Sequence, residues 1–142
     1  MQVFEAMTPE VTTVGPDTTL LEAARLMREN GIGPLPVCDG QRLLGILTDR
    51  DIAIRATAEG LDAGSTPVRQ VMTPEVVTCF EGDDIRKAAE IMQRAQVRRL
   101  LVVDGDGRLA GIVSLGDIAL QTGDDQLSGQ TLERVSEPST ER

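Results

Sequence analysis

The sequence contains no histidine, tryptophan or tyrosine, and only two cysteines. Without histidine, neither a Ser-His-Asp nor a Cys-His catalytic arrangement can be built, and two isolated cysteines cannot form a zinc site or a redox-active Cys-x-x-Cys pair. The chain also lacks a nucleophile motif and a cluster of metal-ligating residues. We therefore expect a protein that is not an enzyme and holds no metal.

Positive charge is scarce as well, since 14 Lys and Arg residues face 23 Asp and Glu residues, for a net charge of −9. A protein that follows a nucleic-acid backbone needs a basic surface to neutralise phosphates. No apolar run approaches the roughly eighteen residues of a membrane span, and no basic region followed by an apolar stretch opens the chain. We expect a cytoplasmic protein with neither a nucleic-acid nor a membrane partner.

The two cysteines both follow apolar residues. Cys38 ends the run that begins at Leu35, and Cys79 follows Val76-Val77-Thr78. Free Cys is among the most frequently buried residue types, so two buried, reduced thiols are the simplest interpretation. A bridge between them is the alternative that the sequence leaves open.

What the chain does contain is an internal repeat. Met7-Thr8-Pro9-Glu10-Val11 returns 65 residues later as Met72-Thr73-Pro74-Glu75-Val76, and one extra residue near Asp106 shifts the offset to 66. That offset aligns Gly45-Ile46-Leu47-Thr48 with Gly111-Ile112-Val113-Ser114. A chain of 142 residues can bury a real core, whereas each copy alone would be marginal. We expect one compact domain in which the two repeats share one core.

Apolar periodicity in the first repeat predicts an amphipathic helix over residues 20–30, with Asp17 as its N-cap and Gly31 as its end. The short apolar runs 35–38 and 43–47 flank Asp39-Gly40-Gln41-Arg42, which is typical of a β-hairpin loop. A second helix is expected from Thr48 or Asp49 towards Gly60. With a first strand near Thr13, the repeat reads β-α-β-β-α.

The second repeat follows the same order, with a strand over 76–78, a helix over 84–95, strands over 100–103 and 109–113, and a helix from Ser114. Residues 60–67 have linker composition. We divide the chain into a first motif over 1–64, a second motif over 65–124, and a polar acidic tail over 125–142. The closing residues 136–142 are too poor in apolar side chains to order themselves. Asp104-Gly105-Asp106-Gly107 resembles part of a calcium loop, but a hydrophobic strand follows at once, which favours a hairpin turn.

Each repeat closes on a hydroxyl followed three residues later by a carboxylate, Thr48 with Asp51 and Ser114 with Asp117. This is the spacing of a capping box, in which both side chains satisfy backbone groups at the start of a helix. A helix N-terminus also attracts phosphate, and a carboxylate there can accept hydrogen bonds from ribose hydroxyls. Capping and binding are compatible, so both interpretations stay open.

The order of these motifs, with Met-Thr-Pro, an amphipathic helix, Pro36-Val37 and then Gly-Ile-x-Thr/Ser-x-x-Asp-Ile given twice, resembles a tandem pair of CBS (cystathionine β-synthase) motifs, or Bateman module. The resemblance covers about residues 3 to 122. It implies an α/β fold, in which two β-α-β-β-α repeats pack as an intertwined pseudo-twofold module with clefts for adenosine-containing ligands. It implies no catalytic part, because no pyridoxal-binding domain is present.

Carried over to this chain, the resemblance assigns ribose and phosphate contacts to Thr48 with Asp51 and to Ser114 with Asp117. It also implies an adenine wall and further contacts at the ends of the first strands. The wall would consist of Leu35, Pro36, Val37, Ile46, Leu100, Leu101 and Ile112, and the further contacts would be Thr12, Thr13 and Thr78.

Arg98 and Arg99 break the symmetry of the repeats, because Gly33 and Pro34 stand at the matching positions. The family places basic residues for phosphate near this strand. A solvated pair of arginines at a turn is the alternative, but two adjacent arginines in an acidic chain favour a phosphate contact. Leu101 replaces Pro36, so the second strand entry is less constrained.

These features predict a stand-alone regulatory module that binds an adenosyl small molecule and relays its presence to an unknown regulated protein. AMP, ADP, ATP, NAD and S-adenosylmethionine are the candidate ligands. We also expect a homodimer with contacts from the helices beginning near Leu20, Thr48, Asp84 and Ser114. The alternative is an interaction module without a nucleotide, in which side chains fill the clefts.

Overall fold

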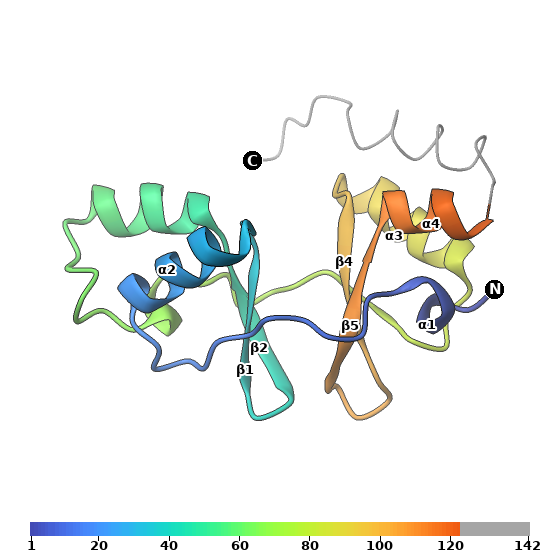
Figure 1. Ribbon diagram of the computed structural model, residues 1–142, viewed down its shortest axis with the longest axis horizontal. Coiled ribbons are helices and arrows are strands. Elements are labelled where there is room, and N and C mark those ends of the chain that lie inside the picture. The colour runs from blue at the N-terminus through green and yellow to red at the C-terminus, as the bar shows by residue number, and fades with distance from the viewer. Residues whose placement is uncertain (123–142) are drawn as a thin grey trace. The chain divides into compact units, whose positions relative to one another are not determined.

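The computed structural model describes residues 1–122 and divides the chain into two compact units, each with two main helices on one face of a small sheet (Figure 1). One unit is formed by residues 12–76, and the other by residues 1–11 together with the chain from residue 77 onward. The predicted mixed α/β fold with two β-α-β-β-α repeats is confirmed. The expected tail over 125–142 lies outside the described residues.

In the 12–76 unit, α2 (Leu20–Asn30) precedes the antiparallel pair β1 (Leu35–Asp39) and β2 (Arg42–Leu47). The predicted second helix follows, but it is a π-helix, η1, over Asp51–Ala56, and a short 3-10 helix, η2, spans Val68–Gln70. The expected first strand is reduced to one parallel bridge between Val14 and Val37. A strand needs consecutive paired residues, and at this place only Val14 is paired.

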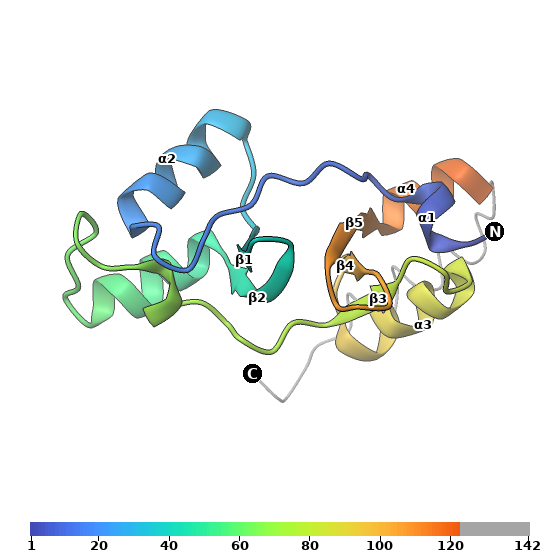
Figure 2. The same cartoon turned by 90° about the horizontal axis from the view of Figure 1, so that it is seen from below.

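The other unit contains α1 (Val3–Ala6), which the sequence reading missed, and a three-stranded sheet in the order β3-β4-β5. Its further elements match the prediction within two residues. They are β3 (Thr78–Phe80), α3 (Ile85–Ala95), β4 (Arg99–Val103), β5 (Leu109–Ser114) and α4 (Leu115–Thr122). Figure 2 shows α1 beside α4, and α1 also contacts α3 and β5.

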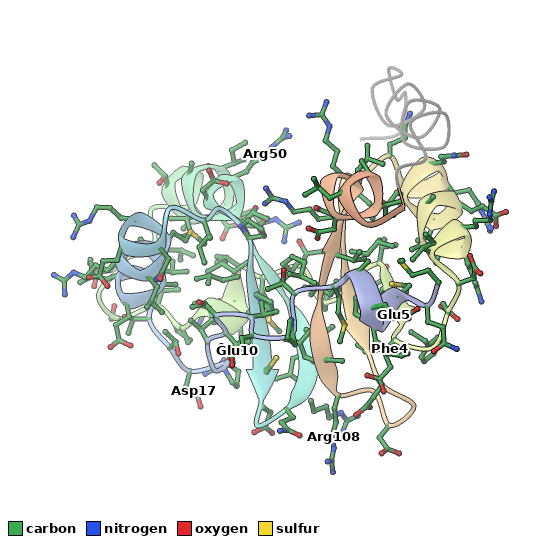
Figure 3. All side chains as sticks on the ribbon, turned by 45° about the vertical axis from the view of Figure 1, so that its right-hand side comes forward. Phe4, Glu5, Glu10, Asp17, Arg50 and Arg108 are labelled. Carbon is green, nitrogen blue, oxygen red and sulfur yellow. The ribbon has the colours of Figure 1, made fainter. Side chains whose placement is uncertain are left out.

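Local signals explain the ends of the helices. Gly31 ends α2 in the left-handed conformation, with φ 63°, as predicted. The N-cap is Thr19 rather than Asp17, because the Thr19 hydroxyl accepts the Glu22 N–H over 3.2 Å. Asp17 extends outward from the preceding turn (Figure 3). Its carboxylate pairs with Arg69 over 3.1 Å. The prediction of Asp17 as the cap was wrong.

Each unit has its own hydrophobic core between its helices and one face of its sheet, so the expectation of one core shared by both repeats was wrong. In the 12–76 unit, Leu20 and Ala23 of α2 pack with Leu35, Val37 and Leu47 of the hairpin. In the other unit, a larger cluster joins α1, α3, α4 and the sheet; its buried members are Val3, Ala6, Cys79, Ile85, Ala88, Ala89, Met92, Leu100, Val102, Val113, Leu115 and Ile118. The helices are held by these faces rather than by intrinsic helix propensity.

The Met-Thr-Pro motifs connect the two sequence copies by exchange. Thr8, from the first copy, exchanges backbone hydrogen bonds of 2.8 and 3.0 Å with Ile112 of the second copy. Thr73, from the second copy, exchanges two bonds of 2.9 Å with Ile46 of the first copy. Each sheet is therefore extended by a segment of the other repeat, and the predicted boundary at residue 64 separates sequence copies rather than compact units.

This exchange explains the glycine of each Gly-Ile motif. A Cβ atom added at Gly45 would lie 2.7 Å from the Thr73 carbonyl oxygen, and one at Gly111 would lie 2.6 Å from the Thr8 carbonyl oxygen. Side-chain carbons do not approach backbone oxygens so closely, so only glycine allows the segments to pair. The glycine of the repeated Gly-Ile motif is thus required for packing of the exchanged segment, in addition to being part of a strand.

Two remaining expectations concern local chemistry. Residues 104–108 form a hairpin turn, as predicted, with the Asp104 carboxylate accepting the N–H groups of Asp106 at 2.9 Å and Arg108 at 3.0 Å. Cys38 and Cys79 are buried and free.

Within the described part of the chain, no helix is long and apolar enough to cross a membrane.

Candidate functional site

The repeated hydroxyl-carboxylate pair forms the same reciprocal cap in both units. The Thr48 N–H donates to Asp51 Oδ2 over 2.9 Å, and the Asp51 N–H donates to Thr48 Oγ1 over 3.1 Å. The corresponding bonds between Ser114 and Asp117 measure 2.8 and 3.0 Å. The capping interpretation is therefore confirmed for both pairs, and all four side chains are partly buried.

Capping uses only Oδ2 of each carboxylate, so Oδ1 is the atom that distinguishes the two caps. In the first cap, Asp51 Oδ1 lies 3.9 Å from Nε of Arg55, and the Asp51 side chain is only 13% exposed. In the second cap, no ion pair of Asp117 is found among residues 1–122. A carboxylate oxygen beside backbone N–H groups of a helix start can accept further hydrogen bonds from hydroxyl groups of a ligand.

The helices that follow the caps also differ. η1 is π-helical over Asp51–Ala56, and the Thr57 N–H reaches back to the Ile52 carbonyl, whereas α4 is an α-helix. π-Helical turns occur mostly as short insertions in α-helices and are frequent at functional sites. Arg55 within η1 contacts Asp51, yet sequence reasoning missed it. The available signal was an acid followed by arginine four residues later, which the second repeat lacks because Gln121 stands there.

The residues expected to form the adenine wall divide between two faces of the strands. Leu35 and Val37 have no exposed surface, and Leu100 is 1% exposed; all three face the core, so their side chains are not available to a ligand. Alternate strand residues point to opposite faces. The residues on the other face are cross-strand partners, Pro36 with Ile46 and Leu101 with Ile112. Of these, Pro36 and Leu101 are buried, whereas Ile46 and Ile112 are partly exposed.

The expected threonines lie on or beside the strand that precedes each helix. Thr12 and Thr13 are exposed, immediately before the Val14–Val37 bridge. Thr78 is partly buried and pairs with Leu101 in the parallel β3–β4 ladder. Thr13 and Thr78 occupy matching positions in the two repeats. Thr13 directly precedes the bridge residue Val14, and Thr78 is the first residue of β3.

Arg99 begins β4 and Arg98 directly precedes it, next to the second cap. Arg99 is the register partner of Ser114, and the Arg98 carbonyl accepts the Leu115 N–H over 2.9 Å. Both side chains are exposed, and neither forms an ion pair within residues 1–122. At the matching place in the other unit, a Cβ atom on Gly33 would lie 3.5 Å from Asp49 Oδ1. At this place the second cap is thus bordered by two arginines and the first cap by the Asp49 carboxylate, so that the cation of the first cap is Arg55 of its own helix.

Comparison with known proteins agrees with this arrangement. The sequence profile of the CBS domain matches residues 3–56 and 68–121. The chain is 42% identical over 134 residues to the CBS domain-containing protein YhcV of Bacillus subtilis, covering 94% of each.

Two solved structures with bound ligands have similar folds. The structure of CBSX2 in complex with AMP has a TM-score of 0.74 and 27% identity, and the match covers 88% of this chain and 98% of CBSX2. The CBS domain pair of protein MJ0100, in complex with 5-methylthioadenosine and S-adenosyl-L-methionine, has a TM-score of 0.70 and 28% identity, with coverage of 85% and 98%. By its two profile matches and its close relative, the chain belongs to the CBS-domain family.

Proposed function

We propose that this protein is a regulatory module that binds an adenosine-containing ligand at the two capped helix starts. The observation that carries the proposal is the repeated cap, which holds a partly buried carboxylate beside backbone N–H groups and leaves one oxygen of that carboxylate for a ligand. The AMP and S-adenosyl-L-methionine complexes of similar structures support the same ligand class. AMP, ADP, ATP, NAD and S-adenosylmethionine are the candidates.

In this proposal, Oδ1 of Asp51 or Asp117 accepts hydrogen bonds from the ribose hydroxyls of the ligand. The hydroxyl group of Thr48 or Ser114 contacts the phosphate, or the group that replaces phosphate in the ligand. Pro36 with Ile46, and Leu101 with Ile112, supply the apolar surface for adenine, while Thr12, Thr13 and Thr78 provide polar contacts. Arg98 and Arg99 favour phosphate at the second cap. No residue is assigned a catalytic role.

Binding titrations with Asp51→Asn and Asp117→Asn test the proposal. Asparagine keeps an oxygen for the cap but removes the charge, so the loss reports on the ligand rather than on the helix. Each substitution should weaken one site by about ten- to a hundredfold, the value of a charge-assisted hydrogen bond. Asp84→Asn is the matched control, because Asp84 also caps a helix, accepting the Arg86 N–H over 2.8 Å.

Calorimetry with adenosine, AMP, ATP, NAD and S-adenosylmethionine measures these affinities. Unchanged affinity in both substituted proteins would show that the carboxylates serve only as caps. Absence of binding by every compound would favour the alternative, an interaction module without a nucleotide.

Relay to a regulated protein requires a ligand that binds two states of the module with different affinity. The free energy by which the ligand shifts the equilibrium between these states can be no larger than that difference in binding free energy.

We further propose that the module is a homodimer that uses the exposed apolar side chains of its helices, among them Leu21 at 39%, Ile54 at 53% and Leu120 at 84% exposure. Light scattering at micromolar concentration should give twice the mass of the chain. A mass equal to one chain would contradict the dimer.

A further inference from the structure

Arg55 connects two parts of the 12–76 unit that are far apart in sequence. Its Nη1 group donates to the carbonyl oxygens of Val71 and Met72 over 3.2 and 3.4 Å. Its Nε lies 3.9 Å from Asp51 Oδ1. One guanidinium group therefore contacts both the cap carboxylate and the backbone that leads into the Met72-Thr73-Pro74 motif. Arginine suits this position because its planar donors are fixed in different directions.

The contacted backbone belongs to the exchanged segment. The Met72 N–H donates to the Val68 carbonyl, and the Thr73 N–H donates to the Ile46 carbonyl, each over 2.9 Å. Thr73 is the residue through which the second copy extends the first copy's sheet. Arg55 therefore contacts the carbonyl groups of the two residues that lead directly into that pairing.

The helix geometry places Arg55 where it can reach both groups. Asp51 and Arg55 are the first and fifth residues of η1, and the π-helical stretch ends at Ala56. The Arg55 side chain is 51% exposed, so it can move without disturbing the core. A distance of 3.9 Å to the carboxylate is long for a charge-assisted hydrogen bond, whereas the bond to Val71 is close to the usual length.

We infer that Arg55 is a positioning residue that couples the Asp51 carboxylate to the exchanged Met72-Thr73 segment. The inference rests on the proposed function for its ligand step, but the coupling itself requires no ligand. When a ribose hydroxyl occupies Asp51 Oδ1, the carboxylate attracts Arg55 less, and the guanidinium is held by the Val71 and Met72 carbonyls alone. Ligand binding then tightens the Thr73–Ile46 pairing.

A ligand-free double-mutant cycle of Asp51→Asn and Arg55→Gln tests the coupling. The measurement is the hydrogen-exchange rate of the Met72 and Thr73 amides under native conditions, which reports on local opening. Arg55→Gln should speed exchange of these amides about tenfold, because their neighbouring carbonyls lose a charged donor. The Asp51→Asn effect should depend on whether Arg55 is present. Additive effects in the cycle would overturn the inference.

Arg94→Gln is the matched control, since Arg94 forms an ion pair of the same spacing with Glu90 over 3.8 Å in α3. It should leave the exchange of Met72 and Thr73 unchanged. Arg55→Lys keeps the charge but not the divergent donors, so it should behave like Arg55→Gln at these amides. Full rescue by lysine would show that charge alone matters and would contradict a two-sided contact.

A second measurement adds saturating AMP. In the wild-type protein, AMP should slow exchange at Met72 and Thr73, and in Arg55→Gln it should bind without this slowing. Equal slowing in both proteins would overturn the inference. If AMP and the other adenosine compounds fail to bind the wild-type protein, the proposed function fails, and the ligand-free cycle still decides the role of Arg55.

Discussion

Asp51 and Asp117 make the same pair of backbone hydrogen bonds at matching positions, but the cations near them come from different directions. Asp51 is approached by Arg55 from within its own helix. The cap of Asp117 is bordered by Arg99, the first residue of β4, and by Arg98, which directly precedes it. The cap is fixed in both repeats because every helix start has unsatisfied N–H groups. The charged residues around the cap are not fixed by the fold, so differences among them can give the two repeats different ligand preferences.

The largest expected effect tests whether the exchange of segments is equally important in both units. Gly45→Ala and Gly111→Ala should each lower the free energy of unfolding by about 3 kcal/mol, since the added methyl group meets a carbonyl oxygen of the exchanged segment. Urea unfolding measures the change. Gly82→Ala is the control, because no atom lies within 4 Å of the added carbon. A loss at only one of the two positions would break the equivalence of the units.

The next largest effect is a loss of stability at alkaline pH, which we expect to come mainly from Cys79 in the second repeat. Burial and, secondarily, the nearby Asp83 carboxylate raise the pKa of Cys79 from its usual 9.0 to about 11. Because the pKa is raised in the folded protein, the stability contribution is complete below pH 9 and is lost as the pH rises towards 11. The total is about 2 to 3 kcal/mol.

Cys79→Val inserts the residue that the first repeat has at this place, Val14, and should remove most of this pH dependence. Burial also raises the pKa of Cys38, so a smaller slope should remain until Cys38→Val is added. Unfolding measured at several pH values between 8 and 11 checks both steps. An unchanged slope in the double variant would assign the alkaline transition to other groups.

The smallest expected effect concerns phosphate preference. Arg98→Ala with Arg99→Ala should weaken ATP binding about tenfold and leave adenosine unchanged, because partly exposed charges favour ligands according to their negative charge. The difference should shrink as salt is added, since the Debye length is about 8 Å at physiological ionic strength. Titration of adenosine, AMP and ATP measures it. An equal loss for all three ligands, or two equivalent sites in the wild-type protein, would show that the arginines only form a solvated turn.

Local sequence signals predicted most of the elements correctly. The helices over 20–30 and 85–95 have apolar periodicity, and both hairpins have Asp-Gly turns, so short-range physics was sufficient. The face of β1 could not be predicted, because Leu35, Pro36, Val37 and Cys38 are all apolar and all buried, which removes the alternation that distinguishes the two faces. The adenine wall was therefore drawn from both faces.

The remaining errors depend on contacts between distant residues. Asp17 and Thr19 are both good capping residues, and the choice of Thr19 accompanies the ion pair of Asp17 with Arg69, which lies 52 residues away. The role of Arg55 depends on carbonyl groups 16 and 17 residues away. The two capping pairs were predictable because their partners are three residues apart.

The pairing of Thr8 with Ile112 also determines the order in which the chain can fold during synthesis. Residues 12–76 form one compact unit from a continuous stretch of chain, so this unit can fold as soon as they have emerged. The first eleven residues must wait for β5, more than a hundred residues later, before Thr8 finds its partner. Residues 1–11 thus precede the 12–76 unit in the sequence but can complete their pairing only after it.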